Sequence, residues 1–266
     1  MKIAIIGTGN LGKSIAKGLI KNNAITSLYL TKRNLVQISE FEGYNNVTLT
    51  ADNQEAVKQS DIIIFAVQPA HFESILHSIK SVLTENHVLI STITGYLIPK
   101  MEAIVGENQH IIRAMPNTAI AVGKSMTCIC GNQKGQQRIA VAEAIFNRLG
   151  HSLIIPESQM QAATVVCASG IAFWMRLIRA TTQAAIQLGF DAKEAQELAM
   201  YTSEGAANLL ITTANHPEEE IDKVTTPMGC TIQGLNEMEH KGLSSSLIQG
   251  MVASFQKINT IKKEQI

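Results

Sequence analysis

The fold is decided by the stretch Lys2-Ile3-Ala4-Ile5-Ile6-Gly7-Thr8-Gly9-Asn10-Leu11-Gly12. A short apolar run leads directly into Gly-x-Gly-x-x-Gly, and an amphipathic run from Ser14 to Ile20 follows. A strand, this glycine turn and a helix form the phosphate-binding turn of a dinucleotide-binding fold. A glycine-rich turn without a ligand is the alternative, and the flanking strand and helix argue against it. We therefore expect a dinucleotide site that includes Gly7, Thr8, Gly9, Asn10, Leu11 and Gly12.

Composition limits the possible partners. The 266 residues suit two domains, and the hydrophobic content of 45% is enough for a sizeable core. Lys plus Arg and Asp plus Glu number 22 each, so the charge balance predicts neither a nucleic-acid nor a membrane partner. No charged-then-apolar leader precedes the first strand, and no apolar run approaches the length of a membrane helix. We expect a cytoplasmic protein, and the low charged fraction of 17% suggests surface buried against another chain.

The four cysteines are Cys128, Cys130, Cys167 and Cys230. None forms a Cys-x-x-Cys pair, and the seven histidines are dispersed, so we expect no metal site. Cys128 and Cys130 would point to one face of a strand, where they favour small core residues over ligands.

Strand-like and helix-like segments alternate up to about residue 155. The expected strands are Lys2–Ile6, Ser27–Leu30, Val47–Thr50, Asp61–Val67, Val88–Ile93, His110–Met115, Ser125–Ile129 and Ser152–Ile155. Helical spacing occurs over Gln54–Gln59, Phe72–Leu83 and Gln136–Leu149. Continuous apolar strands indicate burial on both faces, as in a parallel sheet covered by helices. We therefore expect an α/β fold, with a Rossmann-type doubly wound sheet over residues 1–155.

Residues 156–266 are predicted to form an all-helical domain. We expect helices over Glu157–Leu188, from an Asp191 N-cap to about Thr213, and over Ser244–Ile261, with a loop at Val224–Thr231. The first of these helices has small or apolar residues around most of its circumference, which a small domain cannot bury alone. We therefore expect a homodimer built through this helical domain.

The end of the second strand selects the cofactor. An acidic residue there would bind the ribose of NAD, whereas this chain has Thr31-Lys32-Arg33-Asn34. Arg offers a bidentate fork to a phosphate, so NADP(H) is favoured, with NAD(H) and a solvated basic turn as alternatives. Later strand ends meet at the same rim of the sheet and outline a nicotinamide pocket. Besides the glycine turn, the expected cofactor residues are Thr31, Lys32, Arg33, Asn53, Ala66, Val67, Gln68, Pro69, Thr94, Gly95 and Asn117.

The stretch Arg113-Ala114-Met115-Pro116-Asn117-Thr118 is similar to the signature of pyrroline-5-carboxylate reductases. The resemblance covers nearly the whole chain and includes the Val224–Thr231 loop. It implies reduction of the cyclic imine 1-pyrroline-5-carboxylate to L-proline with NADPH or NADH. It also implies a Rossmann domain followed by a helical dimerisation domain and, in many members, a decamer. By the same resemblance, Thr231 is the catalytic hydroxyl near the ring nitrogen.

The resemblance further implies that the substrate carboxylate is held by Thr226, Gly229, Cys230 and Thr231. Capping of a helix at Cys230-Thr231 is the alternative role. The chain departs from the family pattern at Gln68, Met228 and Cys230, where members have Lys, Gly and a hydroxyl residue. Met avoids positive φ, so Met228 is expected to narrow the loop or change its backbone angles.

These departures leave three readings open. The first is a pyrroline-5-carboxylate reductase, and the second is a reductase of another cyclic imino acid. The third is an NADP(H)-binding paralogue with a regulatory role, which the retained Thr231 and Asn117 argue against. A β-hydroxyacid dehydrogenase is disfavoured because residues 164–175 contain no lysine.

Overall fold

A computed structural model describes residues 1–23 and 25–264. By its contacts, the chain divides into two compact units. The first contains Met1–Ser169 and the chain from Phe255 onward, and the second is Gly170–Ser254. These two units are defined by the contacts between residues. The domain boundary between residues 155 and 156, which the sequence suggests, stays a prediction.

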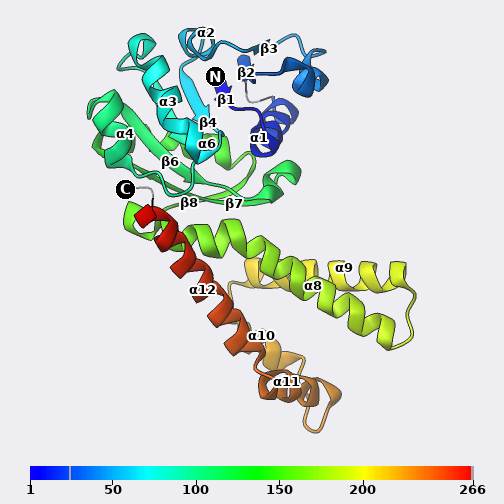
Figure 1. Cartoon of the computed structure of the whole chain (residues 1–266). Helices are drawn as coiled ribbons and strands as arrows, with labels where there is room; N and C mark the ends of the chain where they lie inside the picture. Colours follow the sequence, from blue (N-terminus) through cyan, green and yellow to red (C-terminus); the bar gives the residue numbers. More distant parts are fainter. Residues whose placement is uncertain (24, 265–266) are drawn as a thin grey trace. The chain divides into compact units, whose positions relative to one another are not determined.

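The first unit is built on one eight-stranded sheet in the order β3-β2-β1-β4-β5-β6-β7-β8 (Figure 1). The strands are β1 (Lys2–Ile6), β2 (Ser27–Thr31), β3 (Val47–Thr50), β4 (Ile62–Phe65), β5 (Val88–Ser91), β6 (His110–Met115), β7 (Ser125–Gly131) and β8 (Gly150–Ile154). Neighbouring strands run parallel except β6 and β7, which are antiparallel. The predicted fold class is confirmed.

Helices cover both faces of this sheet. They are α1 (Asn10–Lys21), α2 (Asn53–Lys58), α3 (Pro69–Ile79), α4 (Ile98–Val105), α5 (Gln133–Gln136), α6 (Ile139–Phe146) and α7 (Met160–Ala163). The 3-10 turns are η1 (Leu35–Phe41), η2 (Lys80–Val82), η3 (Thr118–Val122) and η4 (Glu157–Gln159), and η5 (Thr164–Ser169) is a π-helical turn.

Side chains alternate along β1 and feed two separate cores. Ile3 and Ile5 pack with α1 and α6, whereas Ala4 and Ile6 pack with α2, α3 and α4. This alternation follows from the two-residue period of a strand. A strand buried on both faces must be apolar throughout, and the four residues after Lys2 are indeed fully buried.

Several element ends differ from the expected ones. β4 stops at Phe65, because the chain turns there toward α3. That helix begins at Pro69 rather than Phe72, since proline suits the first turn of a helix, where its missing N–H costs nothing. The expected helix Gln136–Leu149 is divided into α5 and α6 by a turn near Arg138.

The second unit is helical. Its helices are α8 (Gly170–Gln187), α9 (Ala192–Thr213), α10 (Pro217–Lys223), α11 (Cys230–His240) and α12 (Leu243–Glu264), the last of which continues into the first unit. α8 and α9 pack along each other (Figure 1). The predicted capping box is confirmed, because Asp191 accepts from the N–H of Glu194 and the Glu194 carboxylate bonds back to Asp191. Helices α10 and α11 were not predicted from the sequence.

The expected helix Glu157–Leu188 is continuous in outline but contains the π-helical turn η5. By length and composition alone, Glu157–Gln187 is apolar enough to cross a membrane, so the expectation that no stretch approaches such a span was wrong. One such helix is weak evidence, since buried helices of globular proteins have the same composition. Only 17% of its most apolar window is buried within the single chain, which leaves most of that surface available to a partner.

Candidate functional site

The glycine turn joins β1 to α1. Gly7 has φ +91°, a conformation that favours glycine, and its N–H donates to the Thr31 hydroxyl at 3.2 Å. A Cβ on Gly12 would lie 2.5 Å from the carbonyl oxygen of Gly7, so helix and strand approach too closely for any side chain there. A Cβ on Gly9 would meet no described heavy atom within 4 Å. The three glycines therefore have different roles. Gly7 adopts a positive φ, Gly12 allows the helix to approach the strand, and Gly9 leaves space open at the N-terminus of the helix.

The N-terminus of α1 is suited to an anion. Gly9 is its N-cap residue, and within the described chain no side chain caps this end of the helix. The first N–H groups of a helix lack intrahelical acceptors and lie at the positive end of its dipole. A phosphate group can accept hydrogen bonds from these N–H groups, and its negative charge is stabilised by the helix dipole.

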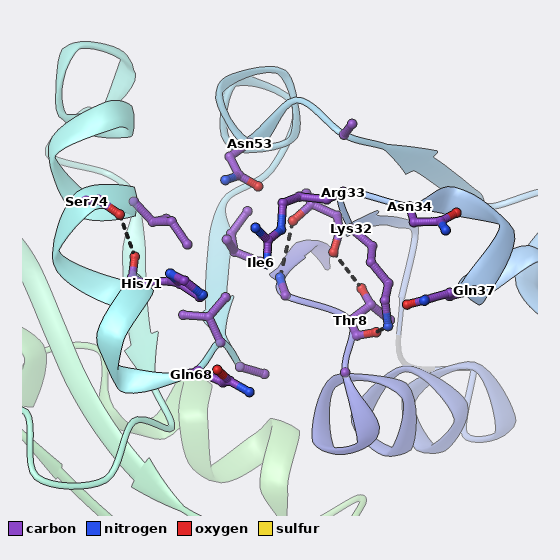
Figure 2. Close-up of a pocket in the computed structure, with 17 residues that line it drawn as sticks. Ile6, Thr8, Lys32, Arg33, Asn34, Gln37, Asn53, Gln68, His71 and Ser74 are labelled. Carbon is purple, nitrogen blue, oxygen red and sulfur yellow. Dashed lines mark hydrogen bonds between the residues drawn. The ribbon is translucent and has the colours of Figure 1, made fainter.

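A cavity of about 640 Å³ opens beside this turn (Figure 2). Ten expected cofactor residues line it: Gly7, Thr8, Gly9, Thr31, Lys32, Arg33, Asn53, Ala66, Val67 and Gln68. The other expected cofactor residues lie outside its lining: Asn10, Leu11, Gly12, Pro69, Thr94, Gly95 and Asn117. Its volume is in the range of small-molecule sites.

The two cations of the cavity are placed differently. Lys32 Nζ donates to the carbonyl oxygen of Thr8 at 2.8 Å, so this amine braces the glycine turn. Arg33 has no hydrogen bond or ion pair to another described residue. Figure 2 shows Arg33, Asn53 and His71 reaching toward the same space from the end of β2, from α2 and from α3. Arg33 is therefore the guanidinium available to a phosphate in this cavity.

Seven further residues line the cavity and were not among the expected cofactor residues: Ile6, Asn34, Gln37, Ala51, His71, Ser74 and Ile75. His71, Ser74 and Ile75 lie on one face of α3, because positions i, i+3 and i+4 of a helix share a face. Pro69 was the signal that could have found them. A helix begun there, directly after a strand end, directs this face toward the rim of the sheet.

The loops after β5 and β6 form a further part of this rim. The Thr92 hydroxyl donates to the carbonyl oxygen of Phe65 at 2.7 Å, which ties the β5 loop to the end of β4. The Tyr96 hydroxyl donates to Glu73 at 3.3 Å, and its ring stacks edge-on against Phe72. Burial and the neighbouring carboxylate raise the pKa of Tyr96 to about 12. These contacts hold the turn at residues 94–95 against the start of α3.

Asn117 caps the turn η3 that follows β6. Its side-chain oxygen accepts from the N–H of Ala119 at 3.0 Å, and its amide donates to the carbonyl oxygen of Cys167 at 3.0 Å. The Asn117 side chain therefore connects this rim loop to η5. The lining of the cavity beside the glycine turn does not include Asn117.

Arg113, the first residue of the signature stretch, is buried rather than at the rim. Its Nη1 donates to Glu157 Oε1 at 2.9 Å, and the same oxygen accepts from the N–H of Ile98 at 2.8 Å. The guanidinium thus joins β6, the start of α4 and the start of the helical stretch at η4. Its role in the described structure is to hold these elements together.

The expected substrate residues lie in the second unit. Gly229 is the N-cap of α11 and no side chain of the described residues caps it, so the capping role suggested for Cys230 and Thr231 is wrong. Both residues instead occupy the first turn of α11, where their N–H groups face an open helix end. Thr226, Cys230 and Thr231 are exposed. The Gly229 N–H donates to the Thr226 carbonyl at 3.0 Å, which closes the loop into a tight turn.

Met228 has a backbone conformation that is typical of glycine. Its φ is +59°, and its side chain is 96% exposed. The backbone at Met228 is therefore in the left-handed conformation that glycine adopts without strain, at a cost of about 1 kcal/mol or more. The side chain points away from packed atoms and narrows nothing within its own unit.

Two family models match the chain. Residues 2–95 match the family described as NADP oxidoreductase, coenzyme F420-dependent, and residues 157–261 match pyrroline-5-carboxylate reductase dimerisation. Pyrroline-5-carboxylate reductase 2 of Dictyostelium discoideum is 40% identical over 272 residues, which cover 96% of this chain and 91% of that protein. The chain belongs to the pyrroline-5-carboxylate reductase family.

Other members agree with this assignment. Pyrroline-5-carboxylate reductase 1 of Dictyostelium discoideum is 44% identical over 96% of this chain, which spans 49% of that longer protein. The solved pyrroline-5-carboxylate reductase of Coxiella burnetii is 28% identical with a TM-score of 0.90, and 97% of each chain is covered. The pyrroline carboxylate reductase of Plasmodium falciparum, solved with NADP bound, is 25% identical with a TM-score of 0.87 and 98% coverage of each chain.

As a member of this family, the chain carries a dimerisation domain in its C-terminal part. That domain accounts for the exposed apolar side chains of α8 and α9, such as Trp174, Met175 and Tyr201, which are 62%, 56% and 69% exposed. Apolar surface of this extent in a single chain marks an interface. The family assignment that the signature at Arg113–Thr118 predicted is confirmed.

Proposed function

We propose that the chain reduces 1-pyrroline-5-carboxylate to L-proline, with NADPH as the hydride donor, in proline biosynthesis. The observation that carries this proposal is the pairing of an intact dinucleotide cradle with relatives of this one activity over nearly the whole chain. NAD(H) is the alternative cofactor, and we place the reaction in the cytoplasm.

The residues of the cavity fit a nicotinamide dinucleotide phosphate. Gly9 leaves open the space through which a pyrophosphate reaches the backbone, and the first turn of α1 offers its free N–H groups. Arg33 is the group for the 2′-phosphate, because it has no other described partner. When bound, this cofactor supplies the hydride that reduces the imine carbon.

The chain's own task is to hold the imine. We propose that the Thr231 hydroxyl donates to the ring nitrogen, which keeps the C=N bond polarised. We further propose that Thr226 and the turn Gly229-Cys230-Thr231 hold the substrate carboxylate, with the N–H groups of Cys230 and Thr231 as backbone donors. The uncapped N-terminus of α11 supports this, since a carboxylate there is stabilised by the helix dipole.

Assembly follows from the dimerisation domain. We propose a homodimer through residues 156–266, with residues 1–155 as the cofactor domain and the decamer of the family resemblance as the larger assembly. We propose neither a nucleic-acid nor a membrane partner, because the charge is balanced at 22 cations and 22 anions.

A second substrate deserves testing because of the loop residues Met228 and Cys230. The purified protein should be offered NADPH with 1-pyrroline-5-carboxylate, with its six-membered homologue, and with neither. We expect NADPH oxidation only with an imine, and a higher kcat/KM for the five-membered ring. A preference for the six-membered ring would assign the second substrate, whereas saturable NADPH binding without turnover of either imine would indicate a regulatory paralogue.

The role of Thr231 can be tested with a conservative pair. Thr231→Val should lower kcat by about 10-fold or more, since it removes a hydrogen bond to the reacting nitrogen. Thr231→Ser keeps the hydroxyl and should retain most of kcat. If Val and Ser behave alike, the hydroxyl has no role in the reaction.

A further inference from the structure

Two thiols that the proposed reaction does not use lie side by side in the first unit. The Sγ atoms of Cys128 and Cys167 are 3.8 Å apart. Cys128 lies on β7 and is 3% exposed, whereas Cys167 lies in the π-helical turn η5 and is half-buried. A disulfide needs a sulfur separation of about 2.05 Å, so the two sulfur atoms are in contact but not bonded.

The two sulfur atoms are chemically unequal. The hydrogen bond between the two sulfur atoms lowers the pKa of Cys167, because it stabilises a thiolate there. The same bond, together with burial, raises the pKa of Cys128. The more accessible sulfur is therefore also the one that ionises first, which is the combination that makes a cysteine reactive toward oxidants. Cys128 is then the thiol placed to resolve the oxidised partner.

The pair is connected by one hydrogen bond to the loop after β6, at the rim of the sheet. The carbonyl oxygen of Cys167 accepts from the Asn117 side chain at 3.0 Å, and Asn117 caps the loop after β6. Cys167 also sits in a π-helical turn, an irregularity that is frequent at functional sites because it is retained against its own cost. A change at Cys167 would therefore reach the Asn117 loop directly.

We propose that Cys128 and Cys167 form a modification site at which a peroxide creates a reversible disulfide that constrains the Asn117 rim. The Cys167 thiolate attacks one peroxide oxygen, the O–O bond breaks, and the other oxygen leaves as water after taking a proton. Cys167 is then a sulfenic acid. The Cys128 sulfur attacks it, the S–O bond breaks and a second water leaves. Two thiols have lost two electrons and two protons, and one hydrogen peroxide has become two waters.

The first test is a map of the thiols in the full-length wild-type protein. Hydrogen peroxide should produce a linked pair of peptides containing Cys128 and Cys167, together with a mass loss of two hydrogens, and dithiothreitol should reverse both. Cys128→Ser should instead leave a sulfenic acid on Cys167 that dimedone traps. Cys130→Ala is the matched control, since it is a buried cysteine on the same strand and should still allow the link. A link that involves Cys230, or four free thiols after peroxide, would overturn the proposal.

The effect on the rim is tested separately and rests on the proposed function. Oxidised wild type should lose about 2- to 30-fold in kcat/KM for the imine, the range of coupling through one contact. Dithiothreitol should restore the rate, and Cys167→Ala should resist peroxide. A linked protein with unchanged kcat/KM would overturn the constraint on the rim. Lack of any imine reduction before oxidation would contradict the proposed function alone, because the peptide map does not depend on activity.

Discussion

Gly9 and Gly12 should respond in opposite ways to alanine, although both belong to the same motif. A Cβ on Gly12 would lie 2.5 Å from the Gly7 carbonyl oxygen and 3.3 Å from Ile5 Cγ2. A Cβ on Gly9 would meet no described heavy atom within 4 Å, and Gly9 has an ordinary φ of −81°. Gly12 is therefore required for packing, whereas Gly9 is required for the space that it leaves free.

The magnitudes follow from these contacts. Gly12→Ala forces backbone atoms of the turn apart, and overpacking of this kind costs about 1–3 kcal/mol. For a chain of this size, that lowers Tm by about 2–12 °C. Gly9→Ala changes only an N-cap residue and should cost under about 1 kcal/mol. Its methyl group stands where a pyrophosphate approaches the backbone, so NADPH affinity should fall by about 10-fold or more.

Thermal melts without cofactor and calorimetric titration with NADPH separate the two effects. Gly43→Ala is the control, because its Cβ also enters open space, in a loop away from the cavity. It should match wild type in both measurements. Equal Tm losses in Gly9→Ala and Gly12→Ala, or wild-type NADPH affinity in Gly9→Ala, would refute the division of roles.

The cofactor cations, a buried amide and a tyrosine give three more tests. Arg33→Met should raise the KM for NADPH about 10-fold and leave the KM for NADH unchanged, because the phosphate loses its bidentate partner. Lys32→Met should raise the KM for both cofactors alike, since the Lys32 amine braces the glycine turn. Equal effects of Arg33→Met on both cofactors would contradict this assignment. Asn132→Ala should lower the free energy of unfolding by about 2–4 kcal/mol in urea, since its buried amide bonds two backbone N–H groups, a carboxylate and a carbonyl. A loss below about 1 kcal/mol would show that other groups replace these bonds. Folding raises the pKa of Tyr96 to about 12, so its contribution to stability is complete below its unfolded pKa of about 10 and is lost as pH rises toward 12. Between pH 10 and pH 12, the Tm of Tyr96→Phe should fall less than the Tm of wild type. The Tm of the control variant Tyr44→Phe should fall as much as that of wild type.

The parallel sheet was predictable from sequence because its strands are short, apolar and regularly spaced. Strands such as Ile62–Phe65 are buried on both faces and are therefore apolar throughout. The C-terminal helices were harder. Pro217–Lys223 and Cys230–His240 bury no residue within the described chain, so neither has the core-facing apolar stripe of a helix such as Pro69–Ile79. Asn215-His216-Pro217 looked only like a helix break. It also starts the next helix, with the His216 side chain as its cap.

The site was predictable where backbone chemistry dictates residue type. Glycine at position 7 follows from its positive φ, and the absence of an acid before Arg33 follows from the charge of the ligand. His71 could be found only indirectly, through the helix that Pro69 begins, because a cavity wall on a helix face requires no particular residue. Arg113 belongs to the signature stretch, and the structure shows it as a buried cation paired with Glu157, away from the cavity. The π-helical turn at Thr164–Ser169 is a shift of hydrogen bonding that leaves no pattern in the sequence.

The strand order β3-β2-β1-β4-β5-β6-β7-β8 also determines how the sheet can assemble during synthesis. β1 is the first of these strands to emerge from the ribosome, and it stands inside the finished sheet. β2 and β3 then add to one side, and β4 to β8 add one after another to the other side. Each new strand meets an edge that already exists, and none must insert between two paired strands. The nascent chain can therefore build its sheet outward in the order of translation, without breaking any pairing made earlier.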